Sequence, residues 1–228
     1  MNLGEKMKLI AFDVDGTILD TLDSITHVVN ETLYENGFYK VDDKDYIRKA
    51  LGYGSYYLIE QALIFPYNHF YDKKVTEEVL KDYIQRYNND DGILTKPYEG
   101  VTELIKELKD EGYKIIAYSN KPDSVLRPLM KEKFDENLFD YILGQVEGHP
   151  AKPNPEILLN MLDEMGISKD DAIYIGDSEV DVKTAKNADM KMIAVTWGFR
   201  DREFLEEYNP DYIVDSTMEL KEVINSMK

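Results

Sequence analysis

The chain has 228 residues, of which 43% are hydrophobic and 32% charged, with a formal net charge of −18 and no cysteine. The acidic excess disfavours binding to nucleic acid or anionic membranes, which requires basic patches, and the lack of cysteine excludes disulfides and thiolate metal sites. No apolar run approaches the ~18 residues of a membrane span, and the opening apolar segment is too short for a signal peptide, which favours a cytoplasmic protein.

Short apolar runs predict the strands of a parallel sheet. Six of them occur, at 7–12, 114–119, 141–144, 172–176, 191–196 and 211–216. Five are nearly all apolar rather than alternating, which is typical of strands covered on both faces, and the sixth is predicted at an edge. With helical patterns between the strands from residue 96 onward, the chain is predicted to be an α/β protein with a doubly wound parallel sheet and a Rossmann-like core.

The segments between these strands have the periodicity of amphipathic helices. Residues 99–112 place apolar side chains at helical spacing, and Gly112 is positioned to end that helix. In 154–166, Pro155 suits a helix start and Gly166 a helix end. We interpret the leucine and methionine stripes of these helices as core packing.

A block of helical patterns interrupts the alternation after the first strand. It contains predicted helices at 24–37, with Ser24 as candidate N-cap, and at 55–64 and 75–87, and no predicted strand. We therefore expect an all-helical cap domain at residues 21–90, inserted into a core made of residues 1–20 and 91–228. The hinges are expected near Leu19–Leu22 and in the polar stretch Asn88–Pro97.

Polar side chains follow three of the predicted strands directly, and Lys152 lies in the loop that follows a fourth. In strand order they are Asp13 and Asp15, Ser119 and Asn120, Lys152, and Asp177 with Asp181. Ligands of open α/β sheets bind at the carboxyl ends of the strands, so these groups are expected to meet in one crevice. Packed carboxylates repel unless a cation joins them, and oxygen ligands suit Mg²⁺, whereas the three histidines are far apart in the sequence.

These motifs resemble a known superfamily. DVDGT, SNK, the lysine of KPNPE and GDSEVD are similar to the four ordered motifs of the haloacid dehalogenase superfamily, and DGTILDT, YSNKP and TWGFR resemble its phosphoglycolate phosphatase-like branch, which has a helical cap. The resemblance implies a Mg²⁺-dependent phosphatase. It would hydrolyse a small phosphorylated metabolite, with phosphoglycolate among the candidates, through an aspartyl-phosphate.

The resemblance also implies catalytic roles. Asp13 would be the nucleophile and a Mg²⁺ ligand. Asp15 would be the general acid and base, and would give the metal its backbone carbonyl. Lys152 would neutralise charge on Asp13 and on the phosphate. This division is chemically sensible, because a carboxylate bound to Mg²⁺ has too low a pKa to carry a proton near neutrality.

The remaining motif residues are implied to bind phosphate and metal. Ser119 and the backbone of Asn120 would hold the phosphate, together with Lys152. Asp177 would complete the metal site, and Asp181 would bind the metal through water or orient Lys152.

The predicted cap offers two candidate substrate residues, Arg48 and Tyr53. Arg48 would meet a second anionic group of the substrate; an exposed helix arginine is the alternative interpretation. The stretch GYGSYY is not a dinucleotide loop, because Tyr57 stands where its third glycine would fall. For the aromatic segment 65–71, lining the site, packing the cap and mediating contacts all stay open.

Other functions remain open at this point. The same aspartyl-phosphate chemistry serves a β-phosphoglucomutase-like phosphosugar mutase, a pyrophosphatase or a nucleotidase. From another class, a phospho-accepting signalling domain also uses an acidic cluster, Mg²⁺, Ser/Thr and Lys, although it needs no inserted cap. The expected partner is a small phosphate ester, and the choice between a monomer and a weak dimer stays open.

Overall fold

The structure, a computed structural model, describes residues 8–65, 69–90 and 92–227. Its main sheet has six parallel strands in the order β5-β4-β1-β6-β7-β8. The strands are β1 (Leu9–Phe12), β4 (Lys114–Pro122), β5 (Tyr141–Gln145), β6 (Ala172–Gly176), β7 (Lys191–Val195) and β8 (Tyr212–Val214). All six predicted strands are confirmed, and β8 is an edge strand as expected; Met7, the first residue of the predicted 7–12 strand, lies outside the described residues.

Helices cover both faces of this sheet, which explains why its central strands are mostly apolar. One face packs on α5 (Val101–Asp110), α6 (Asp123–Lys133) and α10 (Thr217–Ser226). The other packs on α7 (Glu156–Met165), α8 (Glu179–Ala188) and α9 (Arg202–Glu207), and a short 3₁₀ turn, Lys169–Asp171, precedes β6. The doubly wound α/β fold is confirmed.

The helix starts and ends predicted from glycine and proline are largely observed. Pro155 is the N-cap residue of α7, and Gly166 ends that helix in the left-handed conformation at φ 65°. Helix α5 ends at Asp110, and the N–H of Gly112 returns to the carbonyl of Lys109. Glycine fits there because its φ of 92° is unfavourable for other residues.

Along the chain, four helices separate β1 from the other strands of the sheet, and we call them the helical insertion. They are α1 (Leu22–Glu35), α2 (Lys44–Ala50), α3 (Ser55–Ile64) and α4 (Lys73–Asn88). They enclose their own apolar cluster, in which Val29, Ile59 and Tyr83 are buried. Helix α2 was not among the predicted helices.

The N-cap predicted for α1 is wrong. The helix begins at Leu22 with Thr21 at the N-cap position. Ser24 lies inside the first turn, where its buried hydroxyl donates to a carboxylate oxygen of Asp90 at 2.8 Å. Its polar side chain is thus used to join α1 to the end of α4 rather than to cap the helix.

Both connections to the helical insertion pass through one small ribbon. Strand β2 (Leu19–Asp20) pairs antiparallel with β3 (Lys96–Pro97), and these residues fall within the two predicted hinge segments. The entering and leaving chains are therefore tied together at a single place.

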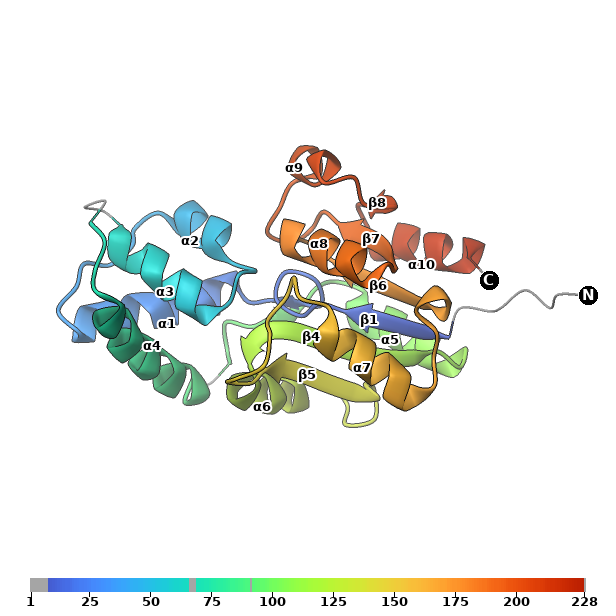
Figure 1. The fold of residues 1–228 in the computed structure, drawn as a ribbon, viewed down its shortest axis with the longest axis horizontal. Helices are drawn as coiled ribbons and strands as arrows, with labels where there is room; N and C mark the ends of the chain where they lie inside the picture. The colour runs from blue at the N-terminus through green and yellow to red at the C-terminus, as the bar shows by residue number, and fades with distance from the viewer. Residues whose placement is uncertain (1–7, 66–68, 91, 228) are drawn as a thin grey trace, which may run out of the picture.

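The helical insertion lies at the carboxyl ends of the central strands. Figure 1 shows the arrowheads of β1 and β4 directed toward it, while α10 lies at the opposite end of the molecule. Within the part of the chain that the structure describes, no helix combines the length and the apolar surface needed to cross a membrane.

Candidate active site

Asp13 stands where β1 ends. Its N–H donates to the carbonyl of Ile175 at 2.8 Å, so the ladder with β6 carries this acid into the interior, where it is 5% exposed. The chain then turns around the carbonyl of Val14, which accepts hydrogen bonds from the N–H groups of Thr17, Ile18 and Leu19. The sequence after the strand is thus wound tightly beside the Asp13 carboxylate.

This turn packs directly against Asp177 at the end of β6. Gly16 has a φ of 87°, and a Cβ on it would lie 2.3 Å from a carboxylate oxygen of Asp177, so only glycine fits. The hydroxyl of Thr17 donates to the other carboxylate oxygen of Asp177 at 2.9 Å. Two segments far apart in the sequence therefore fix this carboxylate.

Asp181 is positioned by the start of α8. Ser178 is the N-cap residue, and its hydroxyl and N–H both donate to Oδ2 of Asp181, at 2.6 and 3.1 Å, in a capping box. Oδ1 of Asp181 faces the site, where it accepts hydrogen bonds from the Lys152 ammonium and the Tyr174 hydroxyl. The positive end of the helix dipole also favours negative charge here.

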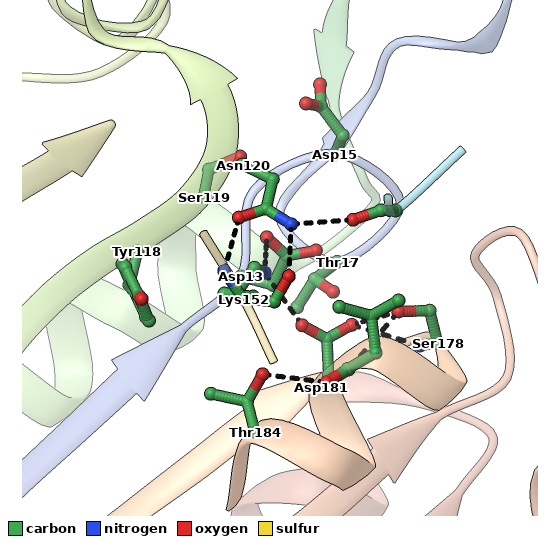
Figure 2. Close-up of polar contacts among 12 residues, drawn as sticks. Asp13, Asp15, Thr17, Tyr118, Ser119, Asn120, Lys152, Ser178, Asp181 and Thr184 are labelled. Carbon is green, nitrogen blue, oxygen red and sulfur yellow. Dashed lines mark hydrogen bonds and ion pairs between the residues drawn. The ribbon is translucent and has the colours of Figure 1, made fainter. Parts of the chain in front are cut away.

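Lys152 joins the acids. It lies in the loop between β5 and α7, and its ammonium donates to Asp13 at 2.7 Å, to Asp181 at 2.8 Å and to the hydroxyl of Tyr174 at 3.2 Å. Its side chain is only 2% exposed. Figure 2 shows Lys152 with Asp13 and Asp181 beside it, and the loop after β5 therefore supplies the charge that lets these acids be buried.

Burial and mutual repulsion shift the titration of this cluster. Loss of hydration, and then the charge of Asp181, raise the pKa of Asp13 well above its ordinary value despite Lys152. Burial and Asp181 raise the pKa of Asp177 to about 7, although the Phe199 N–H and Thr17 oppose the rise. Burial lowers the pKa of Lys152, but Asp13 and Asp181 outweigh it, so the ammonium stays charged.

Three of these carboxylates can share a cation. Oxygen atoms of Asp13, Asp177 and Asp181 all lie within 4.8 Å of one another, and all three residues are buried. Three acids against one lysine leave an excess of negative charge, and this repulsion adds to burial in raising the pKa values of Asp13 and Asp177. A set of carboxylate donors alone suits a hard divalent ion such as Mg²⁺ or Mn²⁺ rather than Zn²⁺. The residues therefore fit a metal ion.

Asp15, the fourth predicted metal residue, does not bring its carboxylate to this group. Figure 2 shows its side chain directed away from Lys152 and Asp181. One carboxylate oxygen instead lies 3.1 Å from the ammonium of Lys121. The side-chain position suits the implied acid and base role, and any contribution to a metal would have to come from the backbone carbonyl.

A narrow pocket of about 40 Å³ lies above the acids. Asp13, Asp15, Ser119, Asn120 and Lys152 all line it, so the structure brings these predicted residues together. The amide of Asn120 accepts from the N–H of Lys152 at 2.8 Å and donates to its carbonyl at 3.0 Å, which ties the strand end to the lysine loop.

The helical insertion closes the other side of this pocket. Gly52 and Gly54 line it, and the carbonyl of Gly52 accepts from the Asn120 amide at 2.9 Å. Tyr83 of α4 also lines it. The pocket thus lies between the sheet and the helical insertion.

Lys121 is a pocket residue that the sequence did not single out. Its ammonium is almost fully buried, contacts Asp15 and donates to the hydroxyl of Tyr87 on α4 at 2.8 Å. The signal was its place directly after Ser119 and Asn120, at the carboxyl end of β4. A solvent-exposed lysine at this position would have been equally compatible with the sequence.

The segment TWGFR contains further residues whose role at the site was not predicted. The N–H of Phe199 donates to Asp177 at 2.7 Å. The next residue, Arg200, is 6% exposed and pairs with Glu179 at 2.8 Å. Its guanidinium also donates to three backbone carbonyls at the end of α2, those of Arg48, Lys49 and Leu51. This segment therefore joins an acid of the candidate metal site to the helical insertion.

The structure does not bring Arg48 to the pocket. Its guanidinium is bound by Asp45 and by the carbonyl of Phe199, and it lines a different hollow beside Arg200. In this structure the salt bridge along α2 and the Phe199 carbonyl hold Arg48 away from the pocket, and its contact with the substrate stays a prediction. Tyr53 lies outside the narrow pocket too, but lines a groove beside it.

Two residues of the aromatic segment 65–71, Phe65 and Tyr71, pack within the helical insertion, whereas Phe70 is largely exposed. Phe65 lies 4.9 Å from the ring of Tyr46, and Tyr71 lies 5.3 Å from the ring of Phe38. Of the open alternatives, these contacts favour packing of the insertion; residues 66–68 lie outside the described residues.

With its fold and acidic cluster in view, this chain belongs to the haloacid dehalogenase-like hydrolase family, whose model matches residues 10–195. It is 30% identical over 214 residues to phosphoglycolate phosphatase 1 of Pseudomonas aeruginosa, covering 93% of this chain and 78% of that protein. It is 29% identical over 227 residues to pyrophosphatase PpaX of Bacillus cereus, covering 97% and 98%.

A solved structure agrees with this assignment. The crystal structure of a provisionally named phosphoglycolate phosphatase from Lactobacillus delbrueckii subsp. bulgaricus superposes with a TM-score of 0.89 at 31% identity. The match covers 96% of this chain and 98% of that one. The family and the hydrolase class, predicted from the motifs, are confirmed. The chain is a phosphatase of the haloacid dehalogenase type.

Proposed function

We propose that this phosphatase hydrolyses a small phosphate monoester with the help of Mg²⁺, by way of a phosphorylated Asp13. The observation that carries the proposal is the buried group of Asp13, Asp177 and Asp181 neutralised only in part by Lys152. Such a site favours binding of a cation, and the bound cation would in turn favour binding of a phosphate dianion. When bound, Mg²⁺ would supply charge stabilisation to the transferring phosphoryl group.

Asp13 is placed to act as the nucleophile. Its carboxylate lines the pocket and is held by the Lys152 ammonium at 2.7 Å. Attack of its oxygen on phosphorus would form the acyl phosphate and release the alcohol. Lys152 and the hydroxyl of Ser119 are suited to hold the phosphoryl oxygens as charge develops on them.

Asp15 is placed to move protons. It lines the same pocket but stays outside the metal group, so its carboxyl is free to donate to the leaving oxygen and then to accept a proton from the attacking water. Lys121 lies 3.1 Å from it and orients it toward the pocket.

The helical insertion would act as a cap, with residues 21–90 as the expected domain. A pocket of about 40 Å³ is too narrow for a substrate to enter as it stands, so the insertion has to shift. The paired β2 and β3, where both connections cross, are the natural pivot.

Release of phosphate from ribose 5-phosphate in Mg²⁺ tests the proposal. Activity should disappear in excess chelator and return with Mg²⁺. Asp13→Asn should lose roughly 10³-fold or more, as expected for a residue acting as part of a unit, whereas Asp42→Asn, an exposed acid, should retain full activity. Full activity of the Asp13 variant, or full activity in chelator, would overturn the proposal.

Trapping the intermediate is a second test. Asp15→Asn should still be phosphorylated slowly by a substrate with a good leaving group, because such a group hardly needs a proton. The phosphate should map to Asp13, and its appearance on another side chain would refute the assignment.

Pyrophosphate is a second candidate substrate. The similarity to pyrophosphatase PpaX extends over nearly the whole of both chains. In this case Lys121, beside Asp15 in the pocket, is the cation available to the second phosphate.

A further inference from the structure

A broad groove opens beside the catalytic pocket. Its volume is about 830 Å³, within the roughly 300–1,000 Å³ of small-molecule sites. The start of α3 and one face of α4 form one wall, and the ends of β4 and β5 with the following loop form the other. Gly54, Ser55 and Asn120 line both the pocket and the groove, so the two hollows adjoin.

The position of the groove beside the pocket indicates which part of the substrate it would bind. A phosphate ester whose phosphorus lies beside Asp13 has its phosphate in the narrow pocket, and the groove is the adjoining space for the rest of the molecule. The wall of the insertion that faces this space is apolar, with the ring of Tyr56 on α3 and the side chains of Leu80 and Ile84 on α4.

The groove offers no excess of positive charge to a second anion. Its charged side chains are Glu77, Lys81 and Glu147, and Glu77 is already paired with Lys73 at 3.3 Å. A leaving group that carries a carboxylate or a further phosphate would find only Lys81, opposed by Glu147. An uncharged leaving group needs no such partner.

The amides of the groove are already engaged. The Gln145 amide donates to the carbonyls of Val146 and His149. The Asn120 amide is committed to Gly52 and Lys152 through both its oxygen and its nitrogen. Ser55, Tyr53 and Tyr56 bring hydroxyls that a sugar could bond, but a bare sugar would leave the apolar and aromatic surface of the groove uncovered, whereas a flat ring can stack on it.

Aromatic surface is available for such stacking. Tyr53 is fixed by its ring contact with Tyr57, at 5.0 Å between centroids and a tilt of 53°. Tyr56 stands in the first turn of α3 and keeps 36% of its surface exposed. Rigid tyrosine rings bind planar groups at a small entropic cost.

We infer that the groove binds the leaving group of a nucleoside monophosphate, with the base against Tyr56 and the ribose at the junction lined by Ser55 and Asn120. The inference rests on the proposed phosphatase function and names its substrate class. It also distinguishes this chain from a phosphatase adapted to compact, doubly anionic esters.

The test compares substrates that differ in one part. In Mg²⁺, kcat/KM should be about tenfold higher for adenosine 5′-monophosphate than for ribose 5-phosphate, which lacks only the base, on the scale of one base–aromatic stack. Phosphoglycolate should fall below adenosine 5′-monophosphate, because it has no ring to stack on Tyr56 and its carboxylate finds no net positive charge in the groove.

Variants then assign the effect to the groove. Tyr56→Ala should lower kcat/KM for adenosine 5′-monophosphate about tenfold and leave ribose 5-phosphate within about twofold, whereas Tyr56→Phe should keep both. Tyr212→Ala, at a tyrosine of matched exposure (38%) on edge strand β8, should change neither.

Each alternative outcome has a distinct meaning. Equal kcat/KM for the two ribose esters, a preference for phosphoglycolate, or an equal loss on both ribose esters in Tyr56→Ala would overturn the groove assignment and leave the phosphatase proposal standing. No turnover of any ester in Mg²⁺ would instead refute the phosphatase proposal itself, and the groove assignment with it.

Discussion

Replacing Asp177 by asparagine should change how the stability of the metal-free protein depends on pH. Burial, followed by Asp181, raises the pKa of Asp177 from 3.8 to about 7, so between these values the folded chain holds a proton that the unfolded chain releases. Stability from this group is complete below pH ~4 and is lost as the pH rises through ~7. The difference of pKa corresponds to ~4 kcal/mol, at ~1.36 kcal/mol per unit.

Urea unfolding of the wild type and Asp177→Asn in chelator, between pH 5 and 8, measures this effect. The wild type should lose most of the ~4 kcal/mol relative to the variant over this range. Added to this pH-dependent difference is a constant cost of ~1–3 kcal/mol in the variant, because an amide has only one oxygen, so either the Phe199 N–H or the Thr17 hydroxyl loses its acceptor.

Saturating Mg²⁺ should remove the decline in the wild type, since the ion binds the deprotonated carboxylates. Profiles of the two proteins that run parallel in chelator within ~1 kcal/mol would refute the reasoning, because Asp177 would then titrate alike in the folded and unfolded chains.

The remaining predictions concern the packing around the site. Arg200→Gln should lower the free energy of unfolding by ~3–5 kcal/mol, because it leaves Glu179 buried and unpaired, and Glu179→Gln in the same chain should restore part of the loss. Gly198→Ala should destabilise the fold and abolish activity, since its Cβ would lie 2.1 Å from the carbonyl of Gly16. Gly37→Ala, which meets nothing within 4 Å, should cost only ~1 kcal/mol through its positive φ.

Urea denaturation and phosphate release check these variants. An Arg200 variant as stable as the wild type would show that the Glu179 carboxylate is hydrated or protonated without its partner. Equal effects of the two glycine substitutions would contradict the steric argument, since only one of them meets a backbone atom.

The sheet could be predicted because burial on both faces leaves an unbroken apolar run. LIAF before Asp13 and AIYIG before Asp177 are examples, and in both the acid follows the last buried residue. The convergence of Asp13, Ser119 and Lys152 followed from parallel strand ends alone. Their spacing along the chain was irrelevant.

Contacts between distant segments could not be predicted in the same way. Arg48 and Arg200 are both arginines beside apolar residues in the sequence, yet one pairs with Asp45 on its own helix and the other crosses to the end of α2. The deciding factor is how the helical insertion docks on the sheet, which leaves no periodic pattern. The ribbon of β2 and β3 was also missed, because two-residue strands carry no alternation.

The central position of β1 has a consequence for folding. Residue Leu9 pairs with Lys114 on one side and Ala172 on the other, so the first strand to be synthesised has no partner until much of the chain exists. Closing so long a loop is entropically costly and slows folding. The helical insertion makes mostly local contacts and has its own apolar cluster, so it can form early and bring Leu19 beside Pro97. By shortening the effective loop, it would hasten the pairing of β1 and reduce the time that an exposed apolar strand has to aggregate.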